Sequence, residues 1–409
     1  MNRTTNTNEI LAQKPLSGVR VLDLTQAYSG PVSAMHLADL GAEVIKIEIP
    51  VYGDQTRTWE PIVDGNSGYF SYFNRNKSGI TLNLKTEEGK TILKKLVEQS
   101  DVLIENYRVG TMEKLGLGYE DTLKDINPKL IYASISGFGL EGPMAKQACY
   151  DTVAQAMGGM ISMTGELGSD GVKIGPAVAD SYSGTYLAVG ICAALYQRTM
   201  TGLGRRIDVS MVDTVFSILE TGVIQYTLKG IISKPSGNAD PVVAPWDSFS
   251  AKDGLFIMAC GTEKFWRDFC TVTGNDELLD DPRFKTNPDR VANYWTALKP
   301  RIEQWSKQLT IDEIEPIILG AGIPFGRIQN IKEATECELI NSRNMIWEYY
   351  DPAFGRKVKY PGTPIKVHGV EDKITKPAPL LGEDNVKILG DLLGYSEEDV
   401  KALTEKGVL

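Results

Sequence analysis

The sequence predicts an α/β protein built around a parallel sheet, and three observations support this. Up to residue 136, short apolar runs typical of buried strands alternate with segments of helical periodicity. The chain has 409 residues, which favours two domains or one large domain with an insertion. Hydrophobic residues make up 42% of it and charged residues 23%, so a substantial core can form.

The first unit of the alternation is a strand, a helix and a second strand. Residues 19–24 form an apolar run, residues 31–40 have helical periodicity, and residues 42–48 form the next apolar run. Two strands joined through a helix in this way lie parallel in one sheet.

The same pattern continues with strands predicted at 80–84, 101–105 and 130–136 and a helix at 86–99. Thr86 can cap this helix, acidic residues follow in its first turn, and its apolar residues form one stripe. These strands extend the parallel sheet.

Residues 150–230 are predicted to be largely helical, with a short strand at 206–211. A stretch rich in proline and glycine then predicts a boundary near 230–247. A smaller α/β domain is expected beyond it, with a strand at 256–259 and helices near 264–272 and 295–309.

A return segment runs from about residue 330 to a last helix, which Ser396 is predicted to cap.

The charge of the chain limits its function. A formal net charge of -10 and a pI near 5.0 argue against a nucleic-acid-binding protein, which needs a basic face. An anionic substrate must therefore meet a local basic patch.

The location is predicted to be cytoplasmic. The five cysteines are widely spaced without a CxxC pattern, which favours reduced thiols. Residues 1–8 are polar and lack the apolar core of a signal peptide, and no apolar stretch reaches 18 residues, so neither secretion nor membrane insertion is expected.

Residues 137–142 spell GFGLEG, which fits the GxGxxG pattern of dinucleotide-binding loops and directly follows a predicted strand. That pattern requires a helix to open at the glycines, but Pro143 and a polar stretch follow here. No strand ending in an acidic residue appears about twenty residues on. We interpret the glycines as an irregular loop.

The chain has two histidines, His36 in the first predicted helix and His368 in a strand-like run, and neither has a spacing that suggests a partner. Neither a zinc site nor a Ser-His-Asp triad is therefore predicted, and no metal is expected. Acid-base or nucleophilic chemistry is expected from carboxylates.

Asp180 precedes an apolar helix predicted at 185–197, and two interpretations of it are open. It can be a plain helix N-cap. Alternatively, the helix dipole holds the carboxylate ionised as a nucleophile, and the small residues Ala179, Ser183 and Gly184 let a bulky substrate approach it.

The chain resembles the class III coenzyme A transferases, which include formyl-CoA:oxalate, carnitine and succinyl-CoA:dicarboxylate transferases. The resemblance covers almost the whole chain and rests on motifs in a fixed order: Leu16 to Asp23, Leu40 to Glu48, Gly53-Asp54 with Arg57, Asn76-Lys77, Leu82 to Lys85, Glu105 to Arg108, Tyr150-Asp151 with Gln155-Ala156, Ala179-Asp180, Gly202 with Gly204, Asp281 to Phe284, and Gly322 to Pro324.

The resemblance implies two domains and an interlocked homodimer. A Rossmann-like large domain would comprise residues 1–230 and 331–409, and residues 231–330 would form a linker and a smaller α/β domain. Acyl-CoA and a small carboxylate, for example a dicarboxylate, would be substrates, and no cofactor would be permanently bound.

The resemblance also implies the chemistry. Asp180 matches the catalytic aspartate of the family, which forms an acyl-aspartyl anhydride with the donor and then an aspartyl-CoA thioester. Tyr150 and Asp151 would position the substrates beside it.

Coenzyme A would be bound by residues from the first strand's loop and the following strands: Gln26, Ala27, Leu82, Lys85, Asn106, Tyr107, Arg108 and Lys114. Lys85 and Lys114 can also be ordinary solvated charges, but together they could supply the positive field that a polyanion needs.

Two positions depart from the oxalate-specific member of the family. Gly261 aligns near its glycine-rich active-site loop, but the run of glycines is reduced to one here. Tyr28 also replaces a glutamine of that site, so neither the gating nor the substrate of that member carries over to this chain.

Two alternatives remain. The α-methylacyl-CoA racemases of the same family place a histidine where this chain has Tyr150, and a tyrosine is a poor proton carrier at neutral pH, so transfer is favoured. A noncatalytic acyl-CoA-binding protein would keep the fold without the chemistry.

Overall fold

The computed structural model describes residues 13–409 of the chain. Residues 1–12 lie outside the described part, and they include the polar segment 1–8 on which the prediction of no signal peptide rests.

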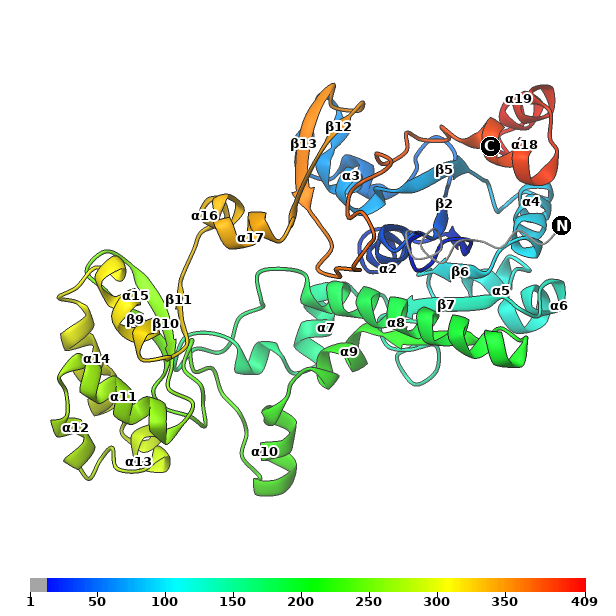
Figure 1. The fold of residues 1–409 in the computed structure, drawn as a ribbon. Helices are drawn as coiled ribbons and strands as arrows, with labels where there is room; N and C mark the ends of the chain where they lie inside the picture. The colour runs from blue at the N-terminus through cyan, green and yellow to red at the C-terminus, as the bar shows by residue number, and fades with distance from the viewer. Residues whose placement is uncertain (1–12) are drawn as a thin grey trace. The chain divides into compact units, whose positions relative to one another are not determined.

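Six parallel strands form the central sheet, in the order β5-β2-β1-β6-β7-β8. Figure 1 labels β5, β2, β6 and β7 among them. Their bounds are β1 (Arg20–Asp23), β2 (Glu43–Glu48), β5 (Lys77–Thr81), β6 (Val102–Glu105), β7 (Ile131–Ser136) and β8 (Arg206–Ser210). The predicted parallel sheet is thus confirmed. The strand order reverses at β1, which pairs with β2 on one side and β6 on the other. Such a switch point is where doubly wound sheets bind their ligands.

β5 differs from its predicted position because it begins three residues earlier, at Lys77, and ends at Thr81. Lys77 is fully buried and its Nζ donates to Asp23 Oδ2 at 2.8 Å. A strand predicted from hydropathy leaves such a lysine out, because the local sequence does not show the distant carboxylate that compensates its charge.

One hydrophobic core lies between the sheet and the helices α4 (Glu87–Glu98), α18 (Asn385–Leu393) and α19 (Glu397–Glu405). The Thr86 side chain accepts from the Gly89 N–H, and Ser396 takes part in a full capping box. Both predicted caps are therefore confirmed.

Two further helices carry parts of the site: α2 (Ser29–Asp39) packs along α8 (Val178–Thr201). The helix predicted at 185–197 is longer than expected at both ends. His36 lies on α2, where burial lowers its pKa. His368 lies in a turn, so the prediction of a strand-like run there was wrong.

The chain divides into two compact units. Among the described residues, the larger contains 13–160, Ile174–Glu220 and Glu338–Leu409. Its remaining α-helices and strands are β3 (Ile62–Val63), β4 (Asn66–Ser67), α3 (Gly68–Asn74), α5 (Thr111–Lys114), α6 (Lys124–Ile126), α7 (Asp151–Met157), α9 (Met211–Ser217), α17 (Glu338–Ser342) and the antiparallel pair β12 (Ile346–Asp351) and β13 (Arg356–Pro361).

The smaller unit contains Ile161–Lys173 and Thr221–Cys337. Its antiparallel sheet, in the order β11-β10-β9, packs against helices around its own aromatic core. Its elements are α10 (Thr221–Lys229), β9 (Trp246–Ser250), β10 (Leu255–Ala259), α11 (Glu263–Thr273), α12 (Glu277–Asp280), α13 (Asn287–Ala292), α14 (Lys299–Ser306), α15 (Ile311–Gly320), β11 (Phe325–Arg327) and α16 (Ile331–Glu336).

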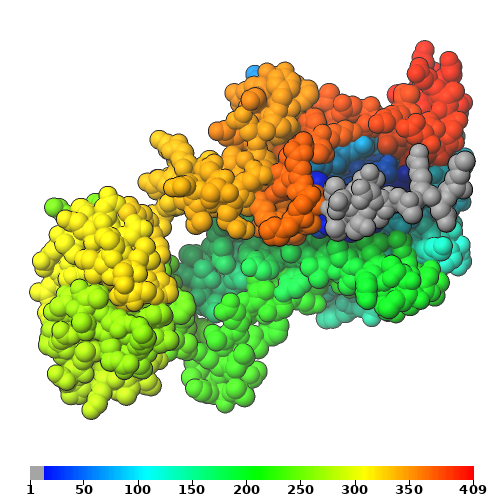
Figure 2. All heavy atoms as spheres, in the orientation of Figure 1, coloured from blue at the N-terminus to red at the C-terminus, as the bar shows by residue number. Residues whose placement is uncertain are grey.

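The return segment of the larger unit packs against its N-terminal part, as the orange and red atoms beside the blue ones show in Figure 2. The segment covers β5, the edge strand. Asp384 N–H donates to Gly79 O at 2.9 Å, Gly79 N–H donates to Asp384 Oδ2 at 2.8 Å, and Thr81 N–H donates to Asn385 Oδ1 at 2.9 Å.

Within residues 13–409, every helix is too short or too polar to cross a bilayer.

Candidate active site

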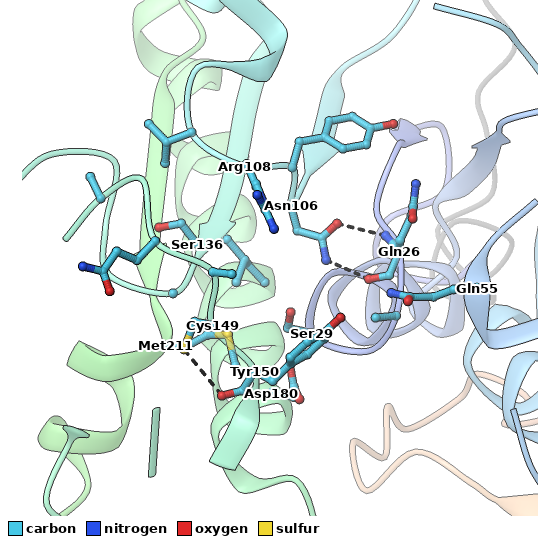
Figure 3. A pocket seen from close by; sticks show the side chains of 18 residues that line it. Gln26, Ser29, Gln55, Asn106, Arg108, Ser136, Cys149, Tyr150, Asp180 and Met211 are labelled. Carbon is cyan, nitrogen blue, oxygen red and sulfur yellow. Dashed lines mark hydrogen bonds between the residues drawn. The ribbon is translucent and has the colours of Figure 1, made fainter. Parts of the chain in front are cut away.

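A cavity of about 340 Å³ opens in the larger unit at the carboxyl ends of β1, β6 and β7 (Figure 3). The residues that follow β1 and β6 line it, and Asp180 of α8 faces it. The cavity therefore lies at the switch point of the sheet, where a doubly wound fold binds ligands.

The loops after β1 and β6 are joined by one side chain. Gln26 N–H donates to Asn106 Oδ1 at 2.9 Å, and Asn106 Nδ2 donates to Gln26 O at 2.7 Å (Figure 3). A single amide thus satisfies both main-chain groups of Gln26 and fixes the two loops side by side.

A buried ion pair, Lys46 with Asp54, also fixes the loop that follows β1. Lys46 Nζ lies 2.9 Å from Asp54 Oδ2 and donates to Thr25 O at 3.0 Å, while Ala27 N–H donates to Asp54 Oδ1 at 3.3 Å. Both charged side chains are fully buried. Burial alone would raise the pKa of Asp54, but Lys46 and hydrogen bonds from Thr56 outweigh it and lower the pKa. Ala27 keeps a φ of 65° in this clamp, a strained conformation for a residue with a side chain.

Asp180 is the third residue of α8, whose N-cap is Ala177. The interpretation of Asp180 as the N-cap is therefore wrong. Its carboxylate accepts from the hydroxyl and the main-chain N–H of Ser29, the first residue of α2. The side chain of Asp180 thus lies at the positive end of α2 rather than capping its own helix.

The small residues near Asp180 serve helix packing. A Cβ at Gly184 would lie 2.5 Å from Ser29 O, so only glycine permits this approach of α8 to α2. Ala179 and Ser183 are fully buried. The prediction that these residues give a substrate access to Asp180 is therefore wrong, because they face the protein interior.

The pKa of Asp180 is raised to about 7, first by burial and then by the negative charge of Asp151. The Ser29 hydrogen bonds only partly offset these effects. Burial and the charge of Asp151 thus oppose the predicted effect of the helix dipole, which favours the ionised carboxylate. A raised pKa at a cavity wall is typical of functional carboxylates, and a more basic carboxylate is a stronger nucleophile.

Asp151 is the first residue of α7 and lies beneath the site. Its Oδ1 accepts from Ala179 N–H at 2.8 Å and Asp180 N–H at 3.4 Å. Asp151 therefore caps α8 from another helix. Tyr150, directly before it, is exposed and lines the cavity.

Several cavity residues were missed by the sequence analysis, among them Ser29, Gln55, Ser136 and Cys149. Ser29 could have been found, because it opens a helix after a strand at the edge where parallel strands end. Cys149 is no rival nucleophile, since burial raises the pKa of its thiol to about 11.

Five of the eight residues predicted to bind coenzyme A line the cavity: Gln26, Ala27, Asn106, Tyr107 and Arg108. The other three do not. Leu82 lies in the hydrophobic core, and Lys85 and Lys114 are exposed.

The two predicted substrate-loop residues, Tyr28 and Gly261, are not among the residues that line the cavity. Tyr28 packs against Phe73, and its hydroxyl is 2.8 Å from Ser181 Oγ. Gly261 belongs to the smaller unit, between β10 and α11.

The glycines of residues 137–142 form an irregular loop after β7, as predicted. Gly137 lines the cavity, and a Cβ there would meet Cys149 Cβ at 2.2 Å. Glycine is thus needed for close packing rather than for opening a helix.

Comparisons with known proteins give a consistent result. Residues 16–385 match the profile of CoA-transferase family III. The chain is 40% identical to acetyl-CoA:oxalate CoA-transferase of Acetobacter aceti, covering 94% of this chain and 97% of that enzyme. It is 36% identical to human succinyl-CoA:glutarate CoA-transferase, covering 97% and 90%. A crystal structure of a CaiB/BaiF family protein from Brucella suis matches with a TM-score of 0.81 and 38% identity, covering 93% of this chain and 100% of that one.

Proposed function

The chain belongs to CoA-transferase family III and is an acyl-CoA:carboxylate CoA-transferase, and on that premise we propose that Asp180 is the nucleophile of the transfer. The observation that carries this proposal is a half-buried carboxylate with a pKa of about 7, facing the cavity at the positive end of α2. Ionisation near neutral pH gives a poorly solvated and therefore reactive carboxylate.

In the proposed reaction, every intermediate is an activated acyl compound, so the energy of the thioester is kept at each step. The Asp180 carboxylate attacks the thioester carbonyl, the C–S bond breaks, and coenzyme A leaves as a thiolate. The thiolate attacks the aspartyl carbonyl of the resulting anhydride, which releases the donor carboxylate and forms an aspartyl-CoA thioester. The acceptor carboxylate then attacks the aspartyl-CoA thioester and releases the thiolate, which gives a second anhydride. The thiolate attacks the acceptor's acyl carbonyl of this anhydride, so the acceptor leaves as the new thioester and the Asp180 carboxylate is regenerated.

The coenzyme A site is proposed to comprise Gln26, Ala27, Leu82, Lys85, Asn106, Tyr107, Arg108 and Lys114. The cavity lining described above supports this role for Gln26 and Ala27 after β1 and for Asn106, Tyr107 and Arg108 after β6. Lys85 and Lys114 are exposed and follow β5 and β6 in the chain. The carboxyl ends of these parallel strands share the edge of the sheet where the cavity lies, which supports a role for both cations in phosphate binding.

The acceptor is proposed to be a small dicarboxylate, because the relatives named above act on oxalate and glutarate. Tyr150, which lines the cavity, would contact the substrates, and Asp151 would hold α8 in place. Tyr28 and Gly261 are proposed as further substrate-loop residues.

We further propose a cytoplasmic, interlocked homodimer, with the large domain formed by residues 1–230 and 331–409 and the smaller domain by 231–330. The location is supported by cysteines that are free throughout the described residues. A partner surface is supported by exposed apolar side chains along one stripe of α8: Tyr182, Tyr186, Val189, Tyr196 and Met200.

Substituting Asp180→Ala tests the nucleophile. Transfer of coenzyme A from an acyl-CoA to a dicarboxylate should disappear while acyl-CoA binding persists. Asp399→Ala is the matched control, because Asp399 is also the third residue of a helix and lies in α19, away from the cavity.

Hydroxylamine or borohydride trapping during turnover gives a direct readout by mass spectrometry. The peptide that contains position 180 should carry the modification. Near-native transfer by Asp180→Ala, or an unmodified peptide during demonstrated turnover, would contradict the proposal.

A further inference from the structure

Gln155 is fully buried on α7, one helical turn after Asp151, and its side-chain amide is used at both ends. Its Nε2 donates to Asp151 Oδ2 at 2.6 Å, and its Oε1 accepts from Ile174 N–H at 2.9 Å. Gln155 is not among the residues that line the cavity.

The bond to Asp151 leads directly to the nucleophile. While Oδ2 of Asp151 accepts from Gln155, Oδ1 accepts from Ala179 N–H and Asp180 N–H. The orientation of the Asp151 carboxylate, and with it the first turn of α8, therefore depends on the donor that Gln155 supplies.

Gln155 also binds the chain on both sides of the excursion 161–173. Its main-chain oxygen accepts from Met160 N–H at 3.1 Å, just before the excursion, and its side chain binds Ile174, just after it. Only three residues separate Ile174 from the start of α8 at Val178. Gln155 thus sets the point from which the chain enters the helix of Asp180.

We propose that Gln155 is a positioning residue for Asp180, acting through Asp151 and through the chain entry at Ile174. The inference rests on the proposed function, because it assumes that Asp180 is the nucleophile. Buried groups that hold a reactive side chain in place have large effects on rate, since a misplacement of about 1 Å can cost about a hundredfold.

Gln155→Met tests the inference, because methionine is similar in length and neutral but can make neither hydrogen bond. We expect kcat to fall by about tenfold to a hundredfold, while KM for acyl-CoA stays within about twofold. Gln99→Met is the matched control. Its Nε2 donates to Leu392 O at 2.7 Å, away from the cavity, so the same change there should leave kcat unaltered.

The pH dependence of kcat in Gln155→Glu distinguishes a positioning role from a merely structural one. The glutamate keeps an acceptor for Ile174 but can donate to Asp151 only while it is protonated. The kcat of this variant should therefore fall with rising pH along a limb that the wild type lacks. A kcat profile parallel to that of the wild type would overturn the inference.

Trapping at position 180 separates this inference from the proposed function. If the wild type forms the acyl-aspartyl adduct and Gln155→Met forms it equally fast, only the role of Gln155 is refuted. A loss of kcat that matches the unfolded fraction, or an equal loss in Gln99→Met, also refutes it. If the wild type forms no adduct during turnover, the nucleophile itself is misassigned.

Discussion

Replacing Asp151 by asparagine should lower the pH at which the enzyme becomes active. Asp180 must be ionised to attack, and its pKa is raised to about 7 by burial and by the charge of Asp151. In the wild type, kcat/KM for acyl-CoA should therefore fall about tenfold per pH unit below pH 7 and level off above it. Asp151→Asn removes the second cause and leaves the first, so the acid limb should move to lower pH.

The size of the shift follows from the geometry. Asp151 Oδ1 lies 3.4 Å from the Asp180 nitrogen. For side chains of this length, we take a separation of roughly 6 Å between the two carboxylates. Coulomb's law with an effective dielectric constant of about 20 gives about 2.8 kcal/mol at that separation, or about 2 pKa units. Because the cavity is open to solvent and salt, we expect a shift of about 1 to 2 units.

The assay is the pH profile of kcat/KM, which reports ionisations of the free enzyme. The asparagine amide can no longer accept from Gln155 at the Oδ2 position, so the plateau of the variant should fall as well. Each profile is normalised to its own plateau. A shift of the acid limb then reports the loss of the Asp151 charge, whereas a lower plateau reports the loss of positioning. Asp399→Asn, which removes a distant charge, should leave the limb in place. An unmoved limb in Asp151→Asn, or a wild-type limb below about pH 5, would refute the electrostatic reasoning.

Three other substitutions have defined outcomes. Gly184→Ala places a Cβ 2.5 Å from Ser29 O, so α8 must shift from α2; we expect a loss of about 1 to 3 kcal/mol in chemical unfolding and a larger loss of kcat than of acyl-CoA affinity. Asp180→Asn should stabilise the protein above pH 7 by up to about 4 kcal/mol. The pKa of Asp180 is higher in the folded than in the unfolded protein, so its ionisation destabilises the fold increasingly from the unfolded-state pKa up to about pH 7. Equal free energies of unfolding for the variant and the wild type at pH 8 would contradict this, and no gain is expected at pH 4. Asn106→Ala removes both bonds to Gln26, so KM for acyl-CoA should rise about tenfold in steady-state kinetics, whereas an unchanged KM would show that the loop holds its shape unaided.

Local signals predicted the elements that depend on local interactions. Thr86 and Ser396 cap helices through neighbours three residues away, so their signals are complete in the sequence. Lys77 shows the opposite case, since its partner Asp23 lies 54 residues earlier and its burial could not be foreseen.

The candidate site shows the same division. The edge of the sheet and the residues after β1 and β6 could be predicted from the strand pattern and the family resemblance. The start of α8 could not, because its cap is supplied by Asp151 of another helix. The raised pKa of Asp180 was missed for the same reason, since both of its causes are tertiary.

The way the return segment covers β5 has a consequence for synthesis of the chain. The main-chain groups of Gly79 and Thr81 receive their partners from Asp384 and Asn385, about three hundred residues later. Until the ribosome has released Asp384 and Asn385, the outermost strand of the finished sheet stays open and can pair with other chains. Nascent chains that lack Asp384 and Asn385 should therefore depend on chaperones at this strand.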